Sequence, residues 1–441
     1  MPTGRFRLYV RKHTTFCKAL LIAVYLLLIL LPLTFALLSG TSPRSSLLYE
    51  IGKAAAIIAF TMLCLQVVLV SRCELLDAVF GIDAAAQFHK VTAICAVCLL
   101  IAHPILLAAA SGRFDLFSAD TSWKVDIGKL TLAFLLLTVA FALTFAFFAV
   151  DYNIWRFLHK SAVLLVLLAF AHSFLIGSDL NNLTMQVTWF ALLAVAASVF
   201  IWRNAVAPWR RRRFTVTDVR PETHDTFTLT FEPEDGRSFP RDPGQFMFLK
   251  LKRPARRSEI HPFTISASPT RQYIVQATIK KSGNFTNTID RTRPGDKGFI
   301  EGPFGKFSLV NFEVGQFLFI AGGVGITPLM SMLRYLKETG DTRPVTFLYA
   351  NKTTDDIIFR KELETMPSNV KVVHILSRPN DSWQGPRGRI DPQFLRQYAG
   401  DILSSAHVFL CGPPPMMTAL KNHLKNLAVP SNRVHFERFT L

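Results

Sequence analysis

The sequence of 441 residues has few acidic residues and no paired set of cysteines. It contains 31 Asp and Glu against 49 Lys and Arg, which gives a formal net charge of +18. Four of the six cysteines lie in or beside apolar runs, which argues against structural disulfides and predicts a reducing compartment for the polar part of the chain. No EF-hand loop is present, so calcium control of that type is not encoded. A Ser-His-Asp or paired-carboxylate set is missing as well.

Apolar residues are abundant instead, because they make up 50% of the chain and gather in residues 1–210. Residues 211–441 have the composition of a soluble protein, so we expect a membrane half followed by a water-soluble half. A bilayer core needs about 20 helical residues. Six runs predict spanning helices, and the first lacks a small-residue cleavage site, so it is not expected to be a removed signal peptide. The runs lie near 19–38, 51–70, 91–110, 130–150, 157–176 and 185–202.

The positive charge flanks the apolar runs and predicts how the chain is oriented. Segments 5–12 and 209–213 carry much of the excess, which is typical of membrane anchoring in the lipid bilayer, and nucleic-acid binding is not expected. Loops on the side of the N-terminus hold 14 Lys and Arg, whereas the alternate loops hold 5. The positive-inside rule therefore places the N-terminus and residues 203–441 in the cytoplasm of a multi-pass plasma-membrane protein.

Four histidines lie within the third and fifth apolar runs, where a polar ring is costly. His89 and His103 share one run, and His159 and His172 share the other. Both runs cross in the same direction, so the second histidine of each lies about 20 Å beyond the first. Histidines bonded to neighbouring helices, or a proton relay, would explain such residues. Two facing pairs at matched depth favour ligation of two haems, because haem iron takes an axial nitrogen from each side.

The spacing of the second pair sets a geometric condition. His103 follows His89 by fourteen positions, a spacing that returns nearly to the same helix face. His172 follows His159 by thirteen positions, a spacing that does not return to the same face. We therefore expect a bulge or altered winding in the fifth helix if both of its rings are to face one seam.

The water-soluble half begins with alternating strand-like segments that predict a small β-barrel. Within it lies the hexapeptide His261–Ser266, HPFTIS, followed by the segment 279–288, IKKSGNFTNT. A glycine followed by backbone N–H donors and a Thr hydroxyl can hold a pyrophosphate, although a Gly-Asn turn between strands is also common.

From residue 316 the pattern changes to alternating strands and helices. The segment 316–336 reads as a strand, a glycine loop and a helix, and its glycines allow backbone to approach a phosphate. The loop differs from G-x-G-x-x-G because Pro328 holds the third glycine position, where it suits the first turn of a helix. Cys411 and Gly412 end a later strand, at the edge where open α/β sheets bind ligands.

Taken in order, HPFTIS, G-x-x-T, GGVGITP and CGPPPM resemble the ferredoxin–NADP reductase type of flavoprotein. With six spanning helices and the two histidine pairs, the chain resembles the NADPH oxidase and ferric reductase flavocytochromes b over nearly its whole length. The resemblance implies a multi-domain membrane protein that binds FAD, NADPH and two b-type haems. It implies a transmembrane bis-haem bundle in 1–207, an FAD-binding β-barrel in 208–313 and an NADPH-binding α/β domain in 314–441.

The resemblance also implies a role for individual residues. Thr264 would lie near the flavin N5, and Cys411 and Gly412 beside the nicotinamide. Near the C-terminus, Phe439 would stack on the flavin with Glu437 nearby, and the alternative for Phe439 is a plain core residue. The haem ligands would be His89 with His159 and His103 with His172. The flavin site would take His261, Pro262, Phe263, Thr264 and Ser266, its pyrophosphate site Lys280, Gly283 and Thr286, and the NADPH site Gly322, Gly323, Gly325, Thr327, Ser377 and Arg378, with Lys352 assisting.

The implied function is electron transfer from cytoplasmic NADPH, through FAD and two haems, to an acceptor on the far side of the membrane. O2, which would give superoxide, is favoured over a ferric chelate as the acceptor. Two alternatives remain open: a haem-carrying subunit that serves a partner protein, and a reductase on an inert anchor. The complete reductase half argues against the first, so no obligatory protein partner is expected.

Overall fold

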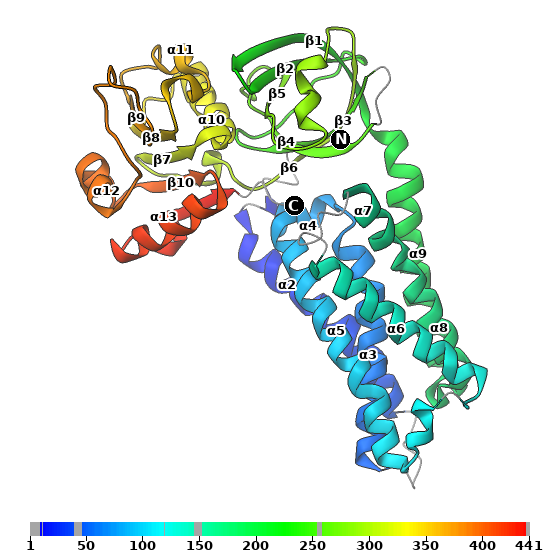
Figure 1. The fold of residues 1–441 in the computed structure, drawn as a ribbon. Helices are drawn as coiled ribbons and strands as arrows, with labels where there is room; N and C mark the ends of the chain where they lie inside the picture. Colours follow the sequence, from blue (N-terminus) through cyan, green and yellow to red (C-terminus); the bar gives the residue numbers. More distant parts are fainter. Residues whose placement is uncertain are drawn as a thin grey trace. The chain divides into compact units, whose positions relative to one another are not determined.

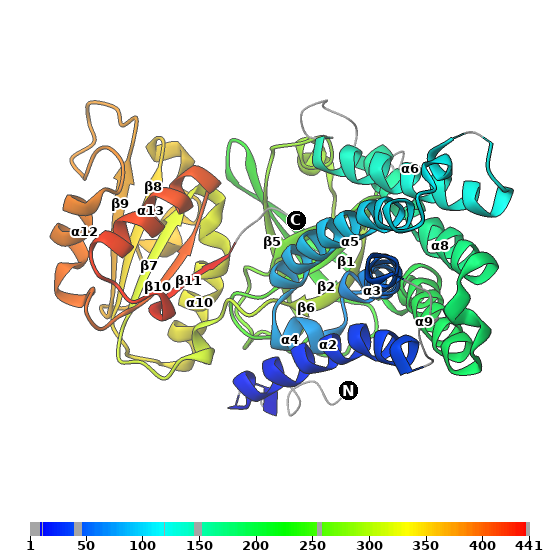
Figure 2. The same cartoon turned by 90° about the horizontal axis from the view of Figure 1, so that it is seen from below.

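The computed structural model describes residues 9–10, 12–38, 46–118, 120–144, 152–253 and 258–437. The chain divides into two compact units, Met1–Trp209 and Arg210–Leu441 (Figures 1 and 2). Each unit has hydrophobic cores of its own, one built from helices and the other from two sheets.

The first unit is a bundle of long apolar helices, and the prediction of six candidate membrane spans is confirmed. In the bilayer, helices are required because each backbone N–H and C=O finds its partner within the segment. The spans are Thr14–Leu38, Leu47–Leu69, Ile82–Ser111, Trp123–Thr144, Ile154–Ile176 and Leu183–Arg210. Their helices are α2 (Thr14–Leu38), α3 (Leu47–Leu69), α5 (Ile82–Ser111), α6 (Trp123–Thr144), α7 (Tyr152–Ser161), α8 (Val163–Ile176) and α9 (Leu183–Ile201), with the short α4 (Glu74–Val79) before α5.

Helix α3 is the most enclosed of the spans and packs against α2, α5, α8 and α9. Both views place it among the other helices (Figures 1 and 2). Aromatic packing joins it to the last span, because the rings of Phe60 and Trp189 stack with centroids 4.9 Å apart. The helix begins at Ser46, whose side chain accepts a hydrogen bond from the Tyr49 amide.

The second unit opens with a six-stranded antiparallel sheet in the order β4-β3-β6-β1-β2-β5. A bridge between Ile265 and Ala277 joins its two edges, so the sheet closes into the predicted barrel. Alternate residues such as Leu229, Phe231 and Leu249 fill its interior. The strands are β1 (Arg212–Thr223), β2 (Thr226–Pro233), β3 (Phe246–Lys252), β4 (Ile260–Thr264), β5 (Val275–Lys280) and β6 (Lys297–Phe304).

The rest of this unit is a parallel sheet in the order β11-β10-β7-β8-β9, as predicted for an α/β domain. Strand β7 alternates between two cores: Phe317 and Phe319 pack against α10, and Leu318 and Ile320 against α12 and α13 (Figure 1). The strand order reverses between β7 and β10, where such sheets bind ligands. The elements are β7 (Phe317–Gly322), α10 (Ile326–Thr339), β8 (Val345–Asn351), α11 (Arg360–Leu363), β9 (Val370–Leu376), α12 (Pro392–Ala399), β10 (His407–Cys411), α13 (Pro414–Asn426) and β11 (Val434–Glu437).

Candidate functional site

The first pair of bundle histidines faces across two helices. His89 on α5 and His159 on α7 have ring centroids 6.0 Å apart. The Nδ1 atoms of both rings are buried, and neither has a hydrogen-bond partner among the described residues. An imidazole nitrogen lies about 2 Å from a ligated metal, so two rings on opposite sides of one iron have centroids about 6 Å apart. The pair therefore has the separation that an axial histidine pair requires.

The second pair lies further along the same two spans and is oriented by backbone carbonyls. The Nδ1 atom of His103 lies 2.8 Å from the Gly52 carbonyl oxygen. The Nδ1 atom of His172 lies 3.0 Å from the Lys124 carbonyl oxygen. Because a carbonyl only accepts, each Nδ1 carries the proton and each Nε2 keeps a lone pair for a metal.

A glycine makes room for one of these rings. An added Cβ at Gly128 on α6 would lie 2.4 Å from the His172 Cε1 atom, so no larger residue fits there without moving the ring. Half-buried rings at two levels on the same two spans, with oriented lone pairs at the second level, fit the donor set of two haem irons.

The fifth span is not one continuous helix. Helix α7 ends at Ser161 and α8 begins at Val163, so the break at Ala162 lies between His159 and His172. The thirteen-residue spacing predicts such an irregularity, and the structure places it three residues after His159.

In the barrel, the strand alternation divides the HPFT residues between two faces. His261 stacks on Phe285 with centroids 4.4 Å apart, and Phe263 lies on the same side, 6.3 Å from that ring. Pro262 and Thr264 therefore point to the opposite face of β4. That face is the one that can meet a flavin ring without displacing Phe285.

Ser266 is differently placed. Its side chain is fully buried, and its hydroxyl contacts the Thr278 hydroxyl at 3.0 Å and the Gln276 carbonyl at 3.3 Å. The hydrogen bonds of this hydroxyl are therefore made within the protein.

The predicted pyrophosphate loop is shaped by Thr286. Its hydroxyl oxygen accepts hydrogen bonds from the amides of Ser282 and Gly283, both at 3.0 Å. Gly283 is open, with no atom within 4 Å of an added Cβ. Lys280 forms an ion pair of 3.0 Å with Asp225. Burial alone would raise the pKa of Asp225, but hydrogen bonds from Lys280 and neighbouring threonines outweigh burial and lower it.

Arg253, which is not among the residues predicted from the motifs, lies at the same loop. Its guanidinium is 5.2 Å from the Phe285 ring and donates to the carbonyl and hydroxyl of Thr288. It is only 7% exposed, so it is a fixed cation beside the loop. The basic run at the end of β3, KLKR, was the available signal.

The glycine loop after β7 and the Cys411–Gly412 turn after β10 form one site. An added Cβ at Gly325 would lie 2.3 Å from the Cys411 carbonyl oxygen. An added Cβ at Gly322 would lie 2.5 Å from the Met416 sulfur. Two segments almost ninety positions apart in sequence therefore meet through their backbones, at the point where the strand order reverses.

Tyr349, which is also not among the predicted residues, fixes the middle of that loop. Its hydroxyl donates to the Gly323 carbonyl at 3.1 Å and accepts from the Ile358 amide at 3.3 Å. Gly323 has φ +51, a conformation that glycine adopts at little cost, and the space beside it is open. Thr327, whose hydroxyl donates to the Val324 carbonyl at 3.1 Å, is buried in the first turn of α10.

Cys411 ends β10 in full burial, opposite Glu437 on β11. Burial, assisted by the charge of Glu437, raises the pKa of the Cys411 thiol well above its ordinary value. The thiol therefore stays neutral and can only be a contact or a weak hydrogen-bond donor. Phe439 lies outside the described residues.

Ser377 and Arg378 begin the loop after β9 and lie beside the end of β8. The Ser377 amide donates to the Asn351 carbonyl at 3.0 Å, and the Arg378 amide donates to the Lys352 carbonyl at 2.8 Å. The side chains of Lys352 and Arg378 are both exposed. The structure therefore brings together the backbones of the two basic residues that were expected at a 2′-phosphate.

Comparison with known proteins gives a family match for each part of the chain. Residues 55–170 match the ferric reductase like transmembrane component, residues 211–308 an FAD-binding domain, and residues 319–422 the oxidoreductase NAD-binding domain. Ferredoxin–NADP reductase B of Sorangium cellulosum is 31% identical over 231 residues, which cover 50% of this chain and 94% of that protein. The glycine betaine monooxygenase reductase subunit of Pseudomonas aeruginosa is 34% identical over 244 residues.

The second of these relatives is matched only in part, because the shared region covers 65% of its length and 52% of this chain. Among solved structures, a flavohemoglobin from Malassezia yamatoensis has a TM-score of 0.50 at 20% identity and covers 89% of this chain and 96% of that one. At that identity the likeness concerns the fold alone.

Proposed function

Because the chain belongs to the ferredoxin–NADP reductase family and carries a ferric-reductase-like transmembrane component, we propose that it moves electrons from cytoplasmic NADPH to O2 across the membrane. It is a multi-pass membrane oxidoreductase that transfers electrons from NAD(P)H through FAD. The finer proposal adds two b-type haems, held by His89 with His159 and by His103 with His172. It also assigns the domains to 1–207, 208–313 and 314–441.

The reaction is divided between the cofactors and the chain. FAD and haem, when bound, would allow the two electrons of one hydride to be passed on one at a time. The chain's residues hold and orient: the open loop between Gly322 and Gly325 receives the dinucleotide phosphates, and Lys352 and Arg378 bind the 2′-phosphate of NADPH. Thr264 and Pro262 line the flavin face of β4. Cys411 would lie beside the nicotinamide as a neutral contact. Hydride transfer removes no proton from NADPH, so no side chain has to act as a base toward it.

The observation that carries the membrane part is the pair of carbonyl-bonded histidines, His103 and His172. A buried imidazole whose Nδ1 is fixed by a carbonyl presents a basic Nε2, and two of these at one level suit a metal rather than a proton relay, in which both ring nitrogens must exchange protons. His89 and His159 face each other at the other level, with ring centroids 6.0 Å apart, but their Nδ1 atoms have no hydrogen-bond partner among the described residues.

The acceptor is proposed from the charges of the predicted outer loops. Lys53 pairs with Glu50 and Asp179, Lys129 with Asp126, and Arg113 with Asp115. Three of the four cations described there thus pair with carboxylates, and the fourth, Lys124, lies 6.0 Å from the Trp123 ring centroid, which leaves little unpaired positive charge for docking an anionic chelate. O2 needs only access. A ferric chelate is the second candidate acceptor, because residues 55–170 match the ferric reductase component.

The test uses purified full-length protein with FAD, haem and NADPH. Reduction of cytochrome c that superoxide dismutase abolishes supports O2 as the acceptor. Insensitivity to the dismutase, together with turnover of ferric citrate, supports the ferric reductase. A reduced-minus-oxidised spectrum without b-type haem bands would contradict the haem proposal and leave a flavoprotein on an inert anchor. Transfer only in the presence of a second protein would support a subunit that serves a partner.

A further inference from the structure

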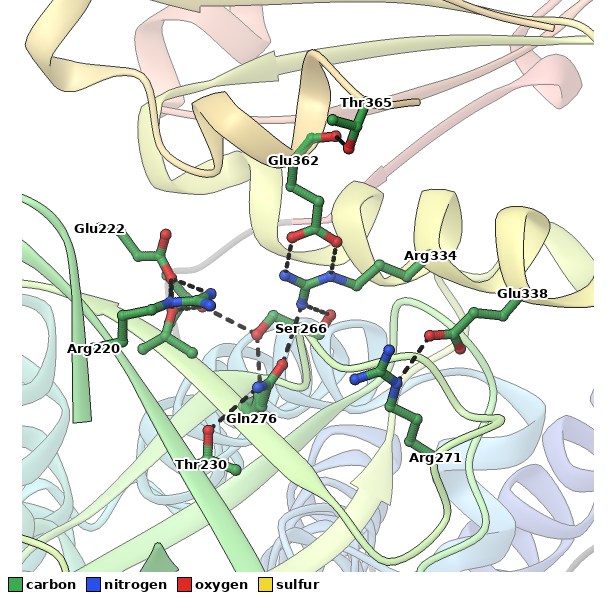
Figure 3. Close-up of polar contacts among 12 residues, drawn as sticks. Arg220, Glu222, Thr230, Ser266, Arg271, Gln276, Arg334, Glu338, Glu362 and Thr365 are labelled. Atoms are coloured by element: carbon green, nitrogen blue, oxygen red, sulfur yellow. Dashed lines mark hydrogen bonds and ion pairs between the residues drawn. The ribbon is translucent and has the colours of Figure 1, made fainter. Parts of the chain in front are cut away.

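The second unit, Arg210–Leu441, is termed the reductase unit, and its two halves are the barrel and the α/β domain. Helix α10 joins these two halves through one face. It begins directly after the glycine loop, and it lies against residues 266–271, which follow the flavin strand β4 and which we term the strap. Ser331, Arg334 and Glu338 are spaced i, i+3 and i+7, so they share a face of the helix. All three contact the strap (Figure 3 shows Arg334 and Glu338).

The central contact is made by Arg334. Its guanidinium donates to the Ser266 carbonyl at 2.8 Å and to the Gln276 side-chain oxygen at 3.3 Å, both on the barrel. On its own half it binds both carboxylate oxygens of Glu362, at 2.8 and 2.6 Å. Arg334 is 9% exposed, so these hydrogen bonds form largely out of water.

The segment that carries Glu362 is itself fitted to the guanidinium. Phe359 has φ 59, a left-handed conformation that a bulky residue rarely adopts. Its ring lies 4.7 Å from the Arg334 guanidinium carbon, a cation–π contact. Strain at this position is consistent with a segment that holds the arginine in one orientation.

Two further contacts flank Arg334 on the same helix face. The Ser331 hydroxyl donates to the Ala267 carbonyl at 3.0 Å, and both residues are buried. At the exposed end, Glu338 accepts from Arg271 at 2.9 Å and from the Thr270 hydroxyl. The contacts therefore run along the strap from its buried start to its exposed end.

We infer that Arg334 is a positioning residue for hydride transfer, because it sets the distance between the flavin strand and the dinucleotide loop. Only one residue, Ile265, separates Thr264 from Ser266, and one rigid helix connects Arg334 to Gly325. Hydride transfer needs the reacting atoms about 3–3.5 Å apart, and a misplacement of about 1 Å costs about 100-fold in rate. The inference rests on the proposed NADPH-to-FAD transfer.

The test replaces Arg334 in the full-length, FAD-loaded protein and follows flavin reduction by NADPH in a stopped-flow instrument. Arg334→Met should lower the rate at saturating NADPH by about 10- to 100-fold, with little change in KM. Arg334→Lys keeps the positive charge but loses the planar guanidinium that binds both oxygens of Glu362, so it should recover part of the rate. Glu362→Gln keeps the shape of the partner side chain and should give a smaller loss of rate. It replaces Arg334→Met in the test if Arg334→Met does not fold.

A matched control comes from the same half. Arg343 also pairs with a carboxylate, Asp341, and lies 4.9 Å from a Phe ring, Phe317, but these partners lie within the α/β half. Arg343→Gln should leave flavin reduction within about twofold of the wild type, because this partly exposed pair makes its contacts within the α/β half and does not reach the strap.

Hydrogen exchange supplies a readout that does not depend on turnover. Amides of the strap should exchange faster in Arg334→Met than in the wild type, and at the wild-type rate in Arg343→Gln. Equal effects of the two substitutions on rate and exchange, or a rise in KM alone, would overturn the inference. A wild-type protein whose flavin NADPH does not reduce would instead overturn the proposed function.

Discussion

The two units prepare their candidate cofactor sites in different ways. The bundle offers side chains: four imidazoles project from two spans, and their separation along the helices sets their depth. The reductase unit offers backbone, because Gly322, Gly323 and Gly325 clear space that a Cβ would fill or strain. A single substitution in the bundle can therefore remove a proposed ligand, whereas a substitution of one of these glycines must change the shape of the loop.

The difference also concerns what supports each site. In the bundle, the carbonyls of Gly52 and Lys124 orient the rings of His103 and His172. In the reductase unit, the support comes from side chains distant in sequence, such as Tyr349 under Gly323 and Arg334 against the strap. Both supports are tertiary contacts, but backbone carbonyls provide them in the bundle and side chains provide them in the reductase unit.

The largest expected effect is the loss of a ligand in the bundle. His103→Leu removes one of the proposed haem ligands, so we expect one of the two proposed haems to be lost and reduction of the external acceptor to be abolished. Flavin reduction by NADPH should persist, because it takes place in the other unit. Haem-to-flavin ratio and stopped-flow flavin reduction measure the two parts separately.

A second substitution reaches the same level of the bundle without removing a ligand. Gly128→Ala places a Cβ against the His172 ring and should reduce haem content, whereas Leu130→Ala, an exposed position on the same helix, should not. Unchanged haem content in both His103→Leu and Gly128→Ala would contradict the assignment of the second pair.

The next effect tests the backbone contact between the two nucleotide segments. Gly325→Ala forces a Cβ toward the Cys411 carbonyl, so the loop or the turn must shift. A shift of about 1 Å lowers the rate of flavin reduction by about 100-fold. Gly315→Ala is the matched control, because nothing lies within 4 Å of its added Cβ. Haem content should be normal in both proteins, and equal rates of flavin reduction would disprove the contact.

The sequence predicts much of the bundle because spanning length and residue separation follow directly from helix geometry. It predicts six spans, two histidine levels and an irregular fifth helix, although not its position at Ala162. The reductase motifs predict two nucleotide-binding domains, which the family matches confirm. They do not reveal that the Ser266 hydroxyl is turned inward to Thr278.

Contacts between distant segments explain the rest. Tyr349, Arg253 and Arg334 belong to no local motif, and their importance follows from which strands and helices become neighbours. Periodicity and loop motifs report local backbone, whereas such contacts depend on sheet order, which a single sequence does not contain. The assigned site residues themselves stay predictions until substitutions are made.

A moderate effect concerns cofactor choice. Arg378→Ala removes one of two cations at the expected 2′-phosphate, and a hydrogen bond to a charged group contributes about 1.5–3 kcal/mol, or about 10- to 100-fold in affinity. The KM for NADPH should rise by about that factor, while the KM for NADH should barely change. Arg396→Ala, an exposed arginine on α12, is the control. An equal rise for NADPH and NADH would remove the assignment.

The smallest effect is a pH dependence of stability in the reductase unit. Burial and the charge of Glu437 raise the pKa of the Cys411 thiol, whereas in the unfolded chain it ionises near pH 8.5. Above about pH 8.5 the unfolded chain therefore loses a proton that the folded chain keeps, and the free energy of unfolding falls by about 1.4 kcal/mol per pH unit. Burial also raises the pKa of Tyr349. In the unfolded chain a tyrosine ionises only near pH 10, so Tyr349 does not contribute to the slope below about pH 10.

Urea unfolding of the full-length protein, followed by flavin release, measures this slope between about pH 8.5 and 10. Cys411→Ala lowers stability at every pH through the cavity that it leaves, but its stability should decline less steeply than that of the wild type. The comparison of slopes separates the titration from the cavity. Parallel slopes would mean that the folded protein ionises Cys411 as readily as the unfolded chain does, and a neutral contact beside the nicotinamide would no longer describe it.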